Sequence, residues 1–255
     1  MPAPTKYFDI GKGAYFGGKN HAGMIPQLIN NIPVHKRKWS VCVGRCAVMQ
    51  WIKPALENIG TDIDYKVIKG WEKVKKKGDY HLEIRRDNIF EFLEHPFFMD
   101  EENFAFGDFP YPLTTRKNQK LRYAHEWTDM EHNFVLDAVK KWKCMVMICS
   151  YENPLYNDRL SDWRTHEYTG FTRKGKSEEI IYMNYEKPKY LHDTRFFGKD
   201  KFERELRRKR RDNWLKNMMN LEGYEKQQYF ERWFETLEKE DALWIKTQLE
   251  KLLKE

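Results

Sequence analysis

Before Lys199, short apolar runs alternate with helical stretches, which is the pattern of an α/β protein. Right-handed crossovers between such runs build a parallel sheet. The last two runs are separated only by the short turn Thr172–Ser177, so we expect them to pair antiparallel at the sheet edge. We therefore predict an α/β fold with seven strands. The strands are Trp39–Val43, Asn58–Asp62, His81–Arg85, Phe104–Asp108, Cys144–Ser150, His166–Phe171 and Glu179–Tyr185.

Helical periodicity is clearest just before the fifth predicted strand. Thr128 and Glu131 fit a capping box, which marks the start of a helix at Asp129. Apolar residues then recur every four positions, and we expect them to form the buried face. These residues are Met130, Phe134, Ala138 and Trp142. The helices predicted between the first strands are Ala47–Glu57, Asp64–Lys77, Asn88–His95 and Asp129–Trp142.

After Pro188 the sequence becomes wholly helical. Regularly spaced apolar residues predict the helices Lys201–Asn217, Tyr224–Leu237 and Asp241–Leu253. We therefore expect two parts, a sheet domain over residues 1–195 and a basic helical extension over residues 196–255.

The positive charge of the chain is concentrated in this extension. Lys and Arg outnumber Asp and Glu by 46 to 39, which gives a net charge of +7. Apolar residues at helical spacing suggest a docked helix that would hold the charge on a fixed surface, although a solvated face is the common reading of such runs. On the first reading the run binds phosphates of a nucleic acid. The residues are Arg207, Arg208, Arg210 and Arg211.

Composition excludes several classes of protein. A hydrophobic content of 40% with 15% aromatic residues argues against global disorder. No apolar run approaches the roughly 20 residues of a membrane span, and the first residues lack the core of a secretory signal, so we expect a cytoplasmic protein with no membrane partner. The 4 cysteines are too few for a disulfide framework, and neither they nor His125 and His132 have the spacing of a metal site. We expect reduced thiols and no metal.

Ligands of open parallel sheets bind beyond the carboxyl ends of the strands, so the residues there are candidates. Gly44 follows the first strand, where glycine lets a cofactor approach the backbone. Asp62 ends the second strand and can accept both hydroxyls of a ribose or cap the next helix. Asp87, after the third, can accept from an adenine amino group or act as a cap.

The fourth strand ends in a turn suited to methyl transfer to an exocyclic amine. The lone pair of adenine N6 is delocalised into the ring, so N6 is a poor nucleophile until acceptors hold its hydrogens. The carboxylate of Asp108 and the carbonyl of Phe109 can accept them, Pro110 fixes the turn, and Tyr111 can stack on the base. An ordinary Pro-Tyr turn that closes a strand is the alternative.

This turn is the fourth in a series of ordered motifs. They comprise Tyr15–Lys19, Gly44 with Ala47–Met49, Asn58–Asp64 and Asp108–Tyr111, followed downstream by Thr114–Arg116, Tyr123–Glu126, Val146–Tyr151, Asn153–Tyr156 and Trp163–Arg164. In this order they resemble the Dam-like DNA N6-adenine methyltransferases, in their phage and bacterial branch. The resemblance covers about Lys12 to about Glu238.

The resemblance implies a Rossmann-like methyltransferase sheet that uses S-adenosylmethionine to methylate N6 of an adenine flipped out of double-stranded DNA. It places Phe16, Gly17, Gly18 and Lys19 at the cofactor and target, Gly44 behind the methionine part, Asp62 at the ribose and Asp87 at the adenine ring. Asp108, Phe109, Pro110 and Tyr111 become the catalytic pocket. The basic residues after the turn would follow the DNA backbone, although a solvated loop is the default. They are Arg116, Lys117, Lys120 and Arg122.

The loop Ser40–Cys46 departs from the family, which has Glu-Pro-Phe-x-Gly-x-Gly there, because Gly44 is the single glycine left. Cys46 replaces bare backbone, and Ser40 replaces a carboxylate near the methionine ammonium. We therefore expect weak binding of S-adenosylmethionine. An active enzyme is one hypothesis, and a catalytically silent DNA-binding subunit of a heteromeric methyltransferase is the other. Phe109 stands where the family has proline, which matters less because the main-chain carbonyl acts there.

Overall fold

A computed structural model of the chain describes residues 4–11, 19, 23–115, 121, 123–172 and 175–252. It divides into two compact units, residues 2–198 and residues 199–255, which are described separately below.

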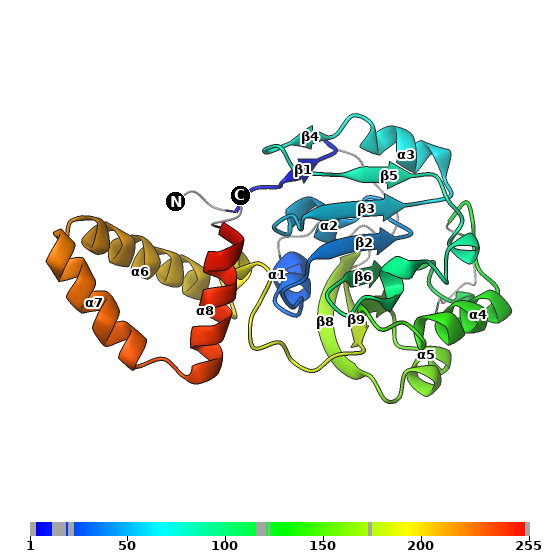
Figure 1. The fold of residues 1–255 in the computed structure, drawn as a ribbon. Helices are drawn as coiled ribbons and strands as arrows, with labels where there is room; N and C mark the ends of the chain where they lie inside the picture. The colour runs from blue at the N-terminus through cyan, green and yellow to red at the C-terminus, as the bar shows by residue number, and fades with distance from the viewer. Residues whose placement is uncertain are drawn as a thin grey trace. The chain divides into compact units, whose positions relative to one another are not determined.

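The first unit contains a seven-stranded sheet with the strand order β5-β3-β2-β6-β7-β9-β8 (Figure 1). The pairs among the first five strands of this order are parallel, whereas β9 runs antiparallel to both β7 and β8. The prediction of an α/β fold with seven strands and an antiparallel edge is confirmed. The strands are β2 (Arg37–Val41), β3 (Glu57–Thr61), β5 (Glu83–Arg85), β6 (Phe104–Gly107), β7 (Met145–Ser150), β8 (Arg164–Thr172) and β9 (Gly175–Met183).

Helices cover both faces of this sheet, and the alternation of side chains in the strands creates one core on each face. Phe104 and Phe106 of β6 pack with residues of α1 and α2, whereas Ala105 between them packs with residues of α4. The helices of this unit are α1 (Met24–Ile29), α2 (Ala47–Trp51), α3 (Tyr65–Trp71), α4 (Asp129–Val139) and α5 (Pro154–Arg159), with 3₁₀ turns η1 (Ile89–Glu91), η2 (Pro96–Met99), η3 (Leu113–Thr115) and η4 (Thr194–Phe196).

Several predicted helices are shorter in the structure. Helix α2 ends at Trp51 rather than Glu57, since Pro54 disfavours the helical conformation of the residue before it and Ile52 is already extended. Helix α3 ends at Trp71, because the next residues form β4 (Lys75–Lys76), which pairs antiparallel with β1 (Phe8–Asp9). The predicted helix Asn88–His95 is only the 3₁₀ turn η1.

Helix α4 begins as predicted, but its predicted buried face is only half right: Trp142, after the helix, is buried and Ala138 is partly buried. The capping box is present, since Glu131 N donates to Thr128 Oγ1 and Thr128 N donates to Glu131 Oε2. Met130 and Phe134, however, are 79% and 56% exposed. A strict four-residue spacing drifts by about 40° per step around a helix, so it does not stay on one face. The buried stripe follows the mixed spacing of three and four residues: His132, Val135, Leu136 and Val139.

The second unit consists of three helices, α6 (Lys201–Met219), α7 (Gly223–Glu235) and α8 (Lys239–Leu252). The side chain of Asp200 caps α6 by accepting from Glu203 N at 2.8 Å. Trp214 Nε1 donates to the Tyr229 hydroxyl at 2.9 Å, which ties α6 to α7. Among the described residues of the whole chain, no helix has both the length and the apolar character that crossing a bilayer needs.

Candidate active site

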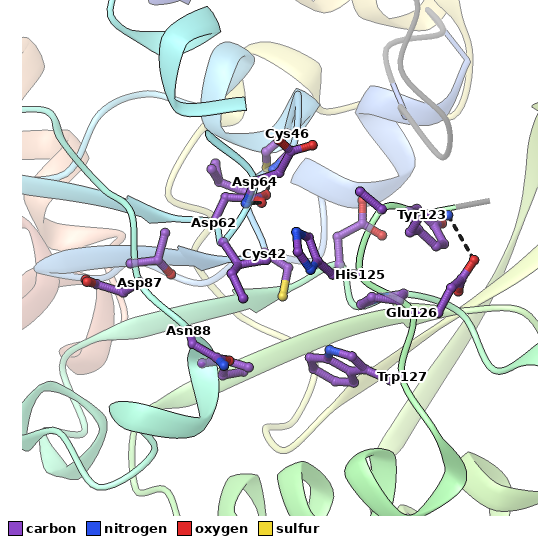
Figure 2. Close-up of a pocket in the computed structure, with 18 of the residues that line it drawn as sticks. Cys42, Cys46, Asp62, Asp64, Asp87, Asn88, Tyr123, His125, Glu126 and Trp127 are labelled. Atoms are coloured by element: carbon purple, nitrogen blue, oxygen red, sulfur yellow. Dashed lines mark hydrogen bonds between the residues drawn. The ribbon is translucent and has the colours of Figure 1, made fainter. Parts of the chain in front are cut away.

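A cavity of about 380 Å³ opens beyond the carboxyl ends of β2, β3, β5 and β6 (Figure 2). This is the edge of a parallel sheet at which ligands bind. Its walls contain predicted site residues from four separate segments and Lys19 from a fifth. They are Lys19, Gly44, Asp62, Asp87, Asp108 and Pro110.

The other predicted residues lie elsewhere or cannot be placed. Phe109 and Tyr111 are buried beside the cavity and are not among the described residues that line it. The arginines of the basic run lie on α6, in the second unit. Phe16, Gly17, Gly18, Arg116, Lys117, Lys120 and Arg122 fall outside the described residues.

The loop after β2 is tied to the end of β3. Gly44 has a φ of +43°, a conformation that favours glycine. Its N–H donates to Asp62 Oδ2 at 2.8 Å, and its carbonyl accepts from Trp71 Nε1 at 2.7 Å. Cys42 has a φ of 54°, and holding a residue other than glycine in that conformation stores strain of roughly 1–3 kcal/mol. The loop therefore has a fixed shape, and the backbone strain at Cys42 is the cost in stability.

Asp62 and Asp87 are available to the cavity because neighbouring residues take the capping roles. Asp64 caps α3 by accepting from Lys66 N, and Asn88 caps η1 by accepting from Phe90 N. Asp62 accepts one backbone N–H on each oxygen, from Gly44 and from Asp64. Burial raises the pKa of Asp62, and the two backbone hydrogen bonds oppose this. Each oxygen retains a lone pair for a further donor.

Asp108 lies at the end of β6 in an ion pair with Lys19. Asp108 Oδ1 is 2.5 Å from Lys19 Nζ, and the side chains are 21% and 3% exposed. Desolvation raises the pKa of Asp108, and the ammonium of Lys19 lowers it. The two carboxylates within reach of Lys19, Asp108 and Glu179, raise the pKa of Lys19 against the opposing effect of its own burial. Lys19 is therefore a charged group in a buried place.

The two aromatic residues of the turn, Phe109 and Tyr111, face inward. The Phe109 ring packs on Trp127 with centroids 5.1 Å apart. A Cβ at Gly107 would lie 2.7 Å from the Phe109 ring, so β6 must end in glycine for this ring to fit. Tyr111 is 5% exposed, and its hydroxyl donates to Glu179 Oε2 at 2.8 Å. In this arrangement the Tyr111 ring belongs to the core behind the cavity.

The two residues that depart from the family pattern are Ser40, within β2, and Cys46, directly before α2. Cys46 lines the cavity and caps α2, since its Sγ accepts from Met49 N at 3.2 Å. Ser40 is fully buried, lies 3.8 Å from Cys46 Sγ, and is not among the described residues lining the cavity. The four cysteines are free. Among the described residues, no group of three or more His, Cys, Asp or Glu side chains could hold a metal ion.

Sequence reasoning assigned no role in the cavity to several aromatic and polar residues of its walls. Trp127 and His125 come from the segment before α4, and Phe90 comes from η1 (Figure 2 labels the first two). They lie in irregular segments, where no periodicity indicates which way a side chain faces. The residues missed in this way include Asn88, Phe90, Tyr123, His125, Glu126 and Trp127.

No protein-family model matches the chain, and no curated protein matches it by sequence. Solved structures with a similar course of the chain include M. capricolum TrmK in complex with S-adenosylhomocysteine, at 13% identity and a TM-score of 0.39, covering 82% of this chain and 91% of that one. Thermotoga maritima spermidine synthase has 17% identity and a TM-score of 0.40, with coverages of 63% and 57%. Magnesium protoporphyrin IX methyltransferase from Synechocystis PCC 6803, with bound S-adenosylmethionine, has 10% identity and a TM-score of 0.40, with coverages of 61% and 72%.

Proposed function

We propose that this protein is a DNA N6-adenine methyltransferase that transfers a methyl group from S-adenosylmethionine to an adenine flipped out of the duplex. One observation carries the proposal. A single cavity joins the acceptor turn at Asp108 to Gly44, Asp62 and Asp87, the residues that the sequence assigns to a cofactor. Four neighbouring strands of the sheet, in the order β5-β3-β2-β6, supply this set from their carboxyl ends.

The residues of the cavity fit S-adenosylmethionine. Asp62 has lone pairs left for the ribose hydroxyls, and Asp87 with Asn88 can bond the amino edge of the adenine. Gly44 lets the methionine part approach the backbone without a Cβ in the way. When bound, the cofactor supplies a methyl group on a positively charged sulfonium, and the acidic wall of the cavity complements that charge.

The chain's own contribution to the reaction is to hold and polarise the amine. As an ionised acceptor, Asp108 accepts one N6–H, and the Phe109 carbonyl is proposed to accept the other. N6 becomes positive as it forms its bond to the methyl carbon while the bond from that carbon to the sulfonium sulfur breaks, and N6 then releases one proton to water. A preorganised negative group next to this charge lowers the barrier, because it needs no rearrangement during the reaction.

The DNA part of the proposal rests on the charge of α6. Arg207 and Arg210 are exposed on this helix, and Arg208 and Arg211 are half-buried. Neutralising all four with glutamine should weaken binding to every duplex sequence alike, since phosphate contacts carry no sequence information. Each lost contact should lower the slope of log affinity against log salt by about 0.9. Glutamine at the surface cations Lys69 and Lys140 of the sheet unit is the control, and an unchanged slope in the α6 variant contradicts the DNA assignment.

A second candidate function is a silent subunit that acts with a catalytic partner. The strained Cys42 and the Cys46 side chain in the cavity wall favour it, because both occupy the loop that should meet the cofactor. In that case calorimetry finds no binding of S-adenosylmethionine by the isolated chain. Methylation then appears only when the partner is added.

The decisive experiment follows labelled methyl from S-adenosylmethionine into duplex DNA with the protein alone. Asp108→Ala should lower transfer by on the order of 10³-fold, because the preorganised acceptor is lost. The matched control is Asp162→Asn, which removes an exposed carboxylate that pairs with Lys140 on the surface. Binding of S-adenosylmethionine should survive in both variants. Wild-type transfer by Asp108→Ala removes the site assignment.

A further inference from the structure

A second carboxylate lies behind the Asp108–Lys19 pair. Glu179 of β9 is 6% exposed and is not among the described residues that line the cavity. Its Oε2 accepts from the Tyr111 hydroxyl at 2.8 Å and from the Tyr168 hydroxyl at 2.7 Å. The same oxygen is 3.7 Å from Lys19 Nζ. Glu179 therefore bonds the acceptor turn directly at Tyr111, and Lys19 lies between it and Asp108.

Strand register places this carboxylate. Tyr168 and Glu179 are direct cross-strand partners in the β8–β9 hairpin, so both side chains project from the same face of the sheet. Tyr111 belongs to the turn after β6 and reaches the same oxygen. The edge hairpin is thus joined to the acceptor turn by a buried hydrogen bond to a charged group, which is shorter and stronger than a neutral one.

Asp108, Lys19 and Glu179 form a buried cluster whose charges do not cancel. Lys19 lies close to Asp108 and neutralises much of its charge. A neutral pair does little for a positive charge that develops nearby. With Glu179 the cluster holds two carboxylates and one ammonium, which leaves one net negative charge in a place with little water to screen it.

We propose that Glu179 is a positioning residue for methyl transfer, which supplies the net negative charge behind Asp108 and holds Lys19 and Tyr111 in place. This inference rests on the proposed function. Glu179 stabilises the positive charge that forms on N6 and anchors the turn that presents the amine. Glu179 neither gains nor loses a proton in the reaction, and it forms no covalent bond.

A change of charge at Glu179 has a signature that a structural role lacks. The negative charge of Glu179 raises the pKa of Asp108, so its removal lowers that pKa. The acid limb of the rate profile, where Asp108 loses activity by taking up a proton, should then move to lower pH. The other titratable groups that face the cluster stay neutral across this range, because burial raises their pKa values. They are Tyr111, Tyr168, Cys149, Cys42 and Cys46.

The test compares Glu179→Gln with Glu178→Gln, which removes an exposed carboxylate from the adjacent position of the same strand. Glutamine can still accept from both tyrosines, so Glu179→Gln isolates the charge. We expect kcat to fall by on the order of 100-fold with the affinity for S-adenosylmethionine retained. The acid limb should move to lower pH in Glu179→Gln alone. Glu179→Asp restores the charge and should return the limb to its wild-type position.

Each outcome decides between the proposals. An active wild type with an unmoved acid limb in Glu179→Gln overturns the inference and leaves the proposed function intact, whether or not the rate falls. An inactive wild type overturns the proposed function, and the inference falls with it. If Glu179→Gln does not fold, as judged by its thermal unfolding, Glu179→Asp and Tyr168→Phe carry the test. Both variants keep the charge of Glu179 but disturb its contacts, so both should lower the rate while the acid limb stays at its wild-type pH. A moved limb in either variant contradicts the inference.

Discussion

Lys19 and Lys38 are both buried in the sheet unit, with 3% and 0% of their side chains exposed, but their surroundings differ. Lys19 Nζ lies against two carboxylates, which raise its pKa. Lys38 Nζ, on β2, has no hydrogen-bond partner among the described residues, and burial lowers its pKa to about 7. Burial alone drives a lysine toward its neutral form, and only close counter-charges reverse this. The first lysine belongs to an assembled ionic site, and the second is an uncompensated group in the core.

The largest effect should follow from breaking the compensated site. Lys19→Met leaves Asp108 and Glu179 facing each other without a cation, and we expect a loss of about 3–5 kcal/mol in the free energy of unfolding near neutral pH. One carboxyl then has a folded pKa above its unfolded value, so the folded state takes up a proton as the pH falls. The loss should therefore be smaller at acidic pH than at alkaline pH.

Urea unfolding at several pH values measures this loss. Lys69→Met is the control, since Lys69 is 48% exposed and pairs with Glu72 on the surface. The Lys69→Met change should alter stability little, because exposed ion pairs contribute little to it. A loss for Lys19→Met that is the same at every pH would show that Lys19 contributes packing rather than charge.

Replacing the uncompensated lysine, Lys38, should change the free energy of unfolding in the opposite direction. Lys38→Met replaces a buried amine by an apolar side chain and should stabilise the protein by about 1–4 kcal/mol at neutral pH and below. The folded pKa of Lys38, about 7, is below the value of 10.5 for a free lysine. Between these values the unfolded chain binds more protons, so the stability of the wild type rises with pH and the advantage of the variant shrinks. Urea unfolding across this range checks the trend, and a variant that is less stable at all pH values contradicts it.

The smallest effect sharpens the comparison at a neighbouring group. Burial, together with the charges of Lys38 and Lys53, lowers the pKa of His192 to about 4. Lys38→Met should raise the pKa of His192 by a fraction of a pH unit, as measured by nuclear magnetic resonance titration of the imidazole protons. His166 of β8, whose pKa burial and Arg164 lower, is the internal control and should not move. An unchanged pKa of His192 in Lys38→Met would mean that Lys38 is already neutral below pH 7.

The sequence predicted the sheet well because its central strands β6 and β7 are short apolar runs, and chain connectivity then restricts the strand order. It was wrong about Met130 and Phe134 of α4, which are apolar but exposed, because a strict spacing of four residues does not stay on one face of a helix. The places of Asp62, Asp87 and Asp108 in the cavity wall could be predicted, because the end of a strand fixes where a side chain lies. The Tyr168–Glu179 pair could not, because Glu178 and Glu179 look alike until the register of the hairpin is known.

The central claim is tested most directly by the chemical position of the methyl group. Duplex DNA is incubated with the wild-type protein and S-adenosylmethionine and digested to nucleosides, which are then identified by mass spectrometry. The account predicts that the digest contains N6-methyldeoxyadenosine. The wild type and Asp162→Asn should form it, and Asp108→Ala should not. Methyl groups on cytosine, on another position of adenine, or absent from the DNA would contradict it.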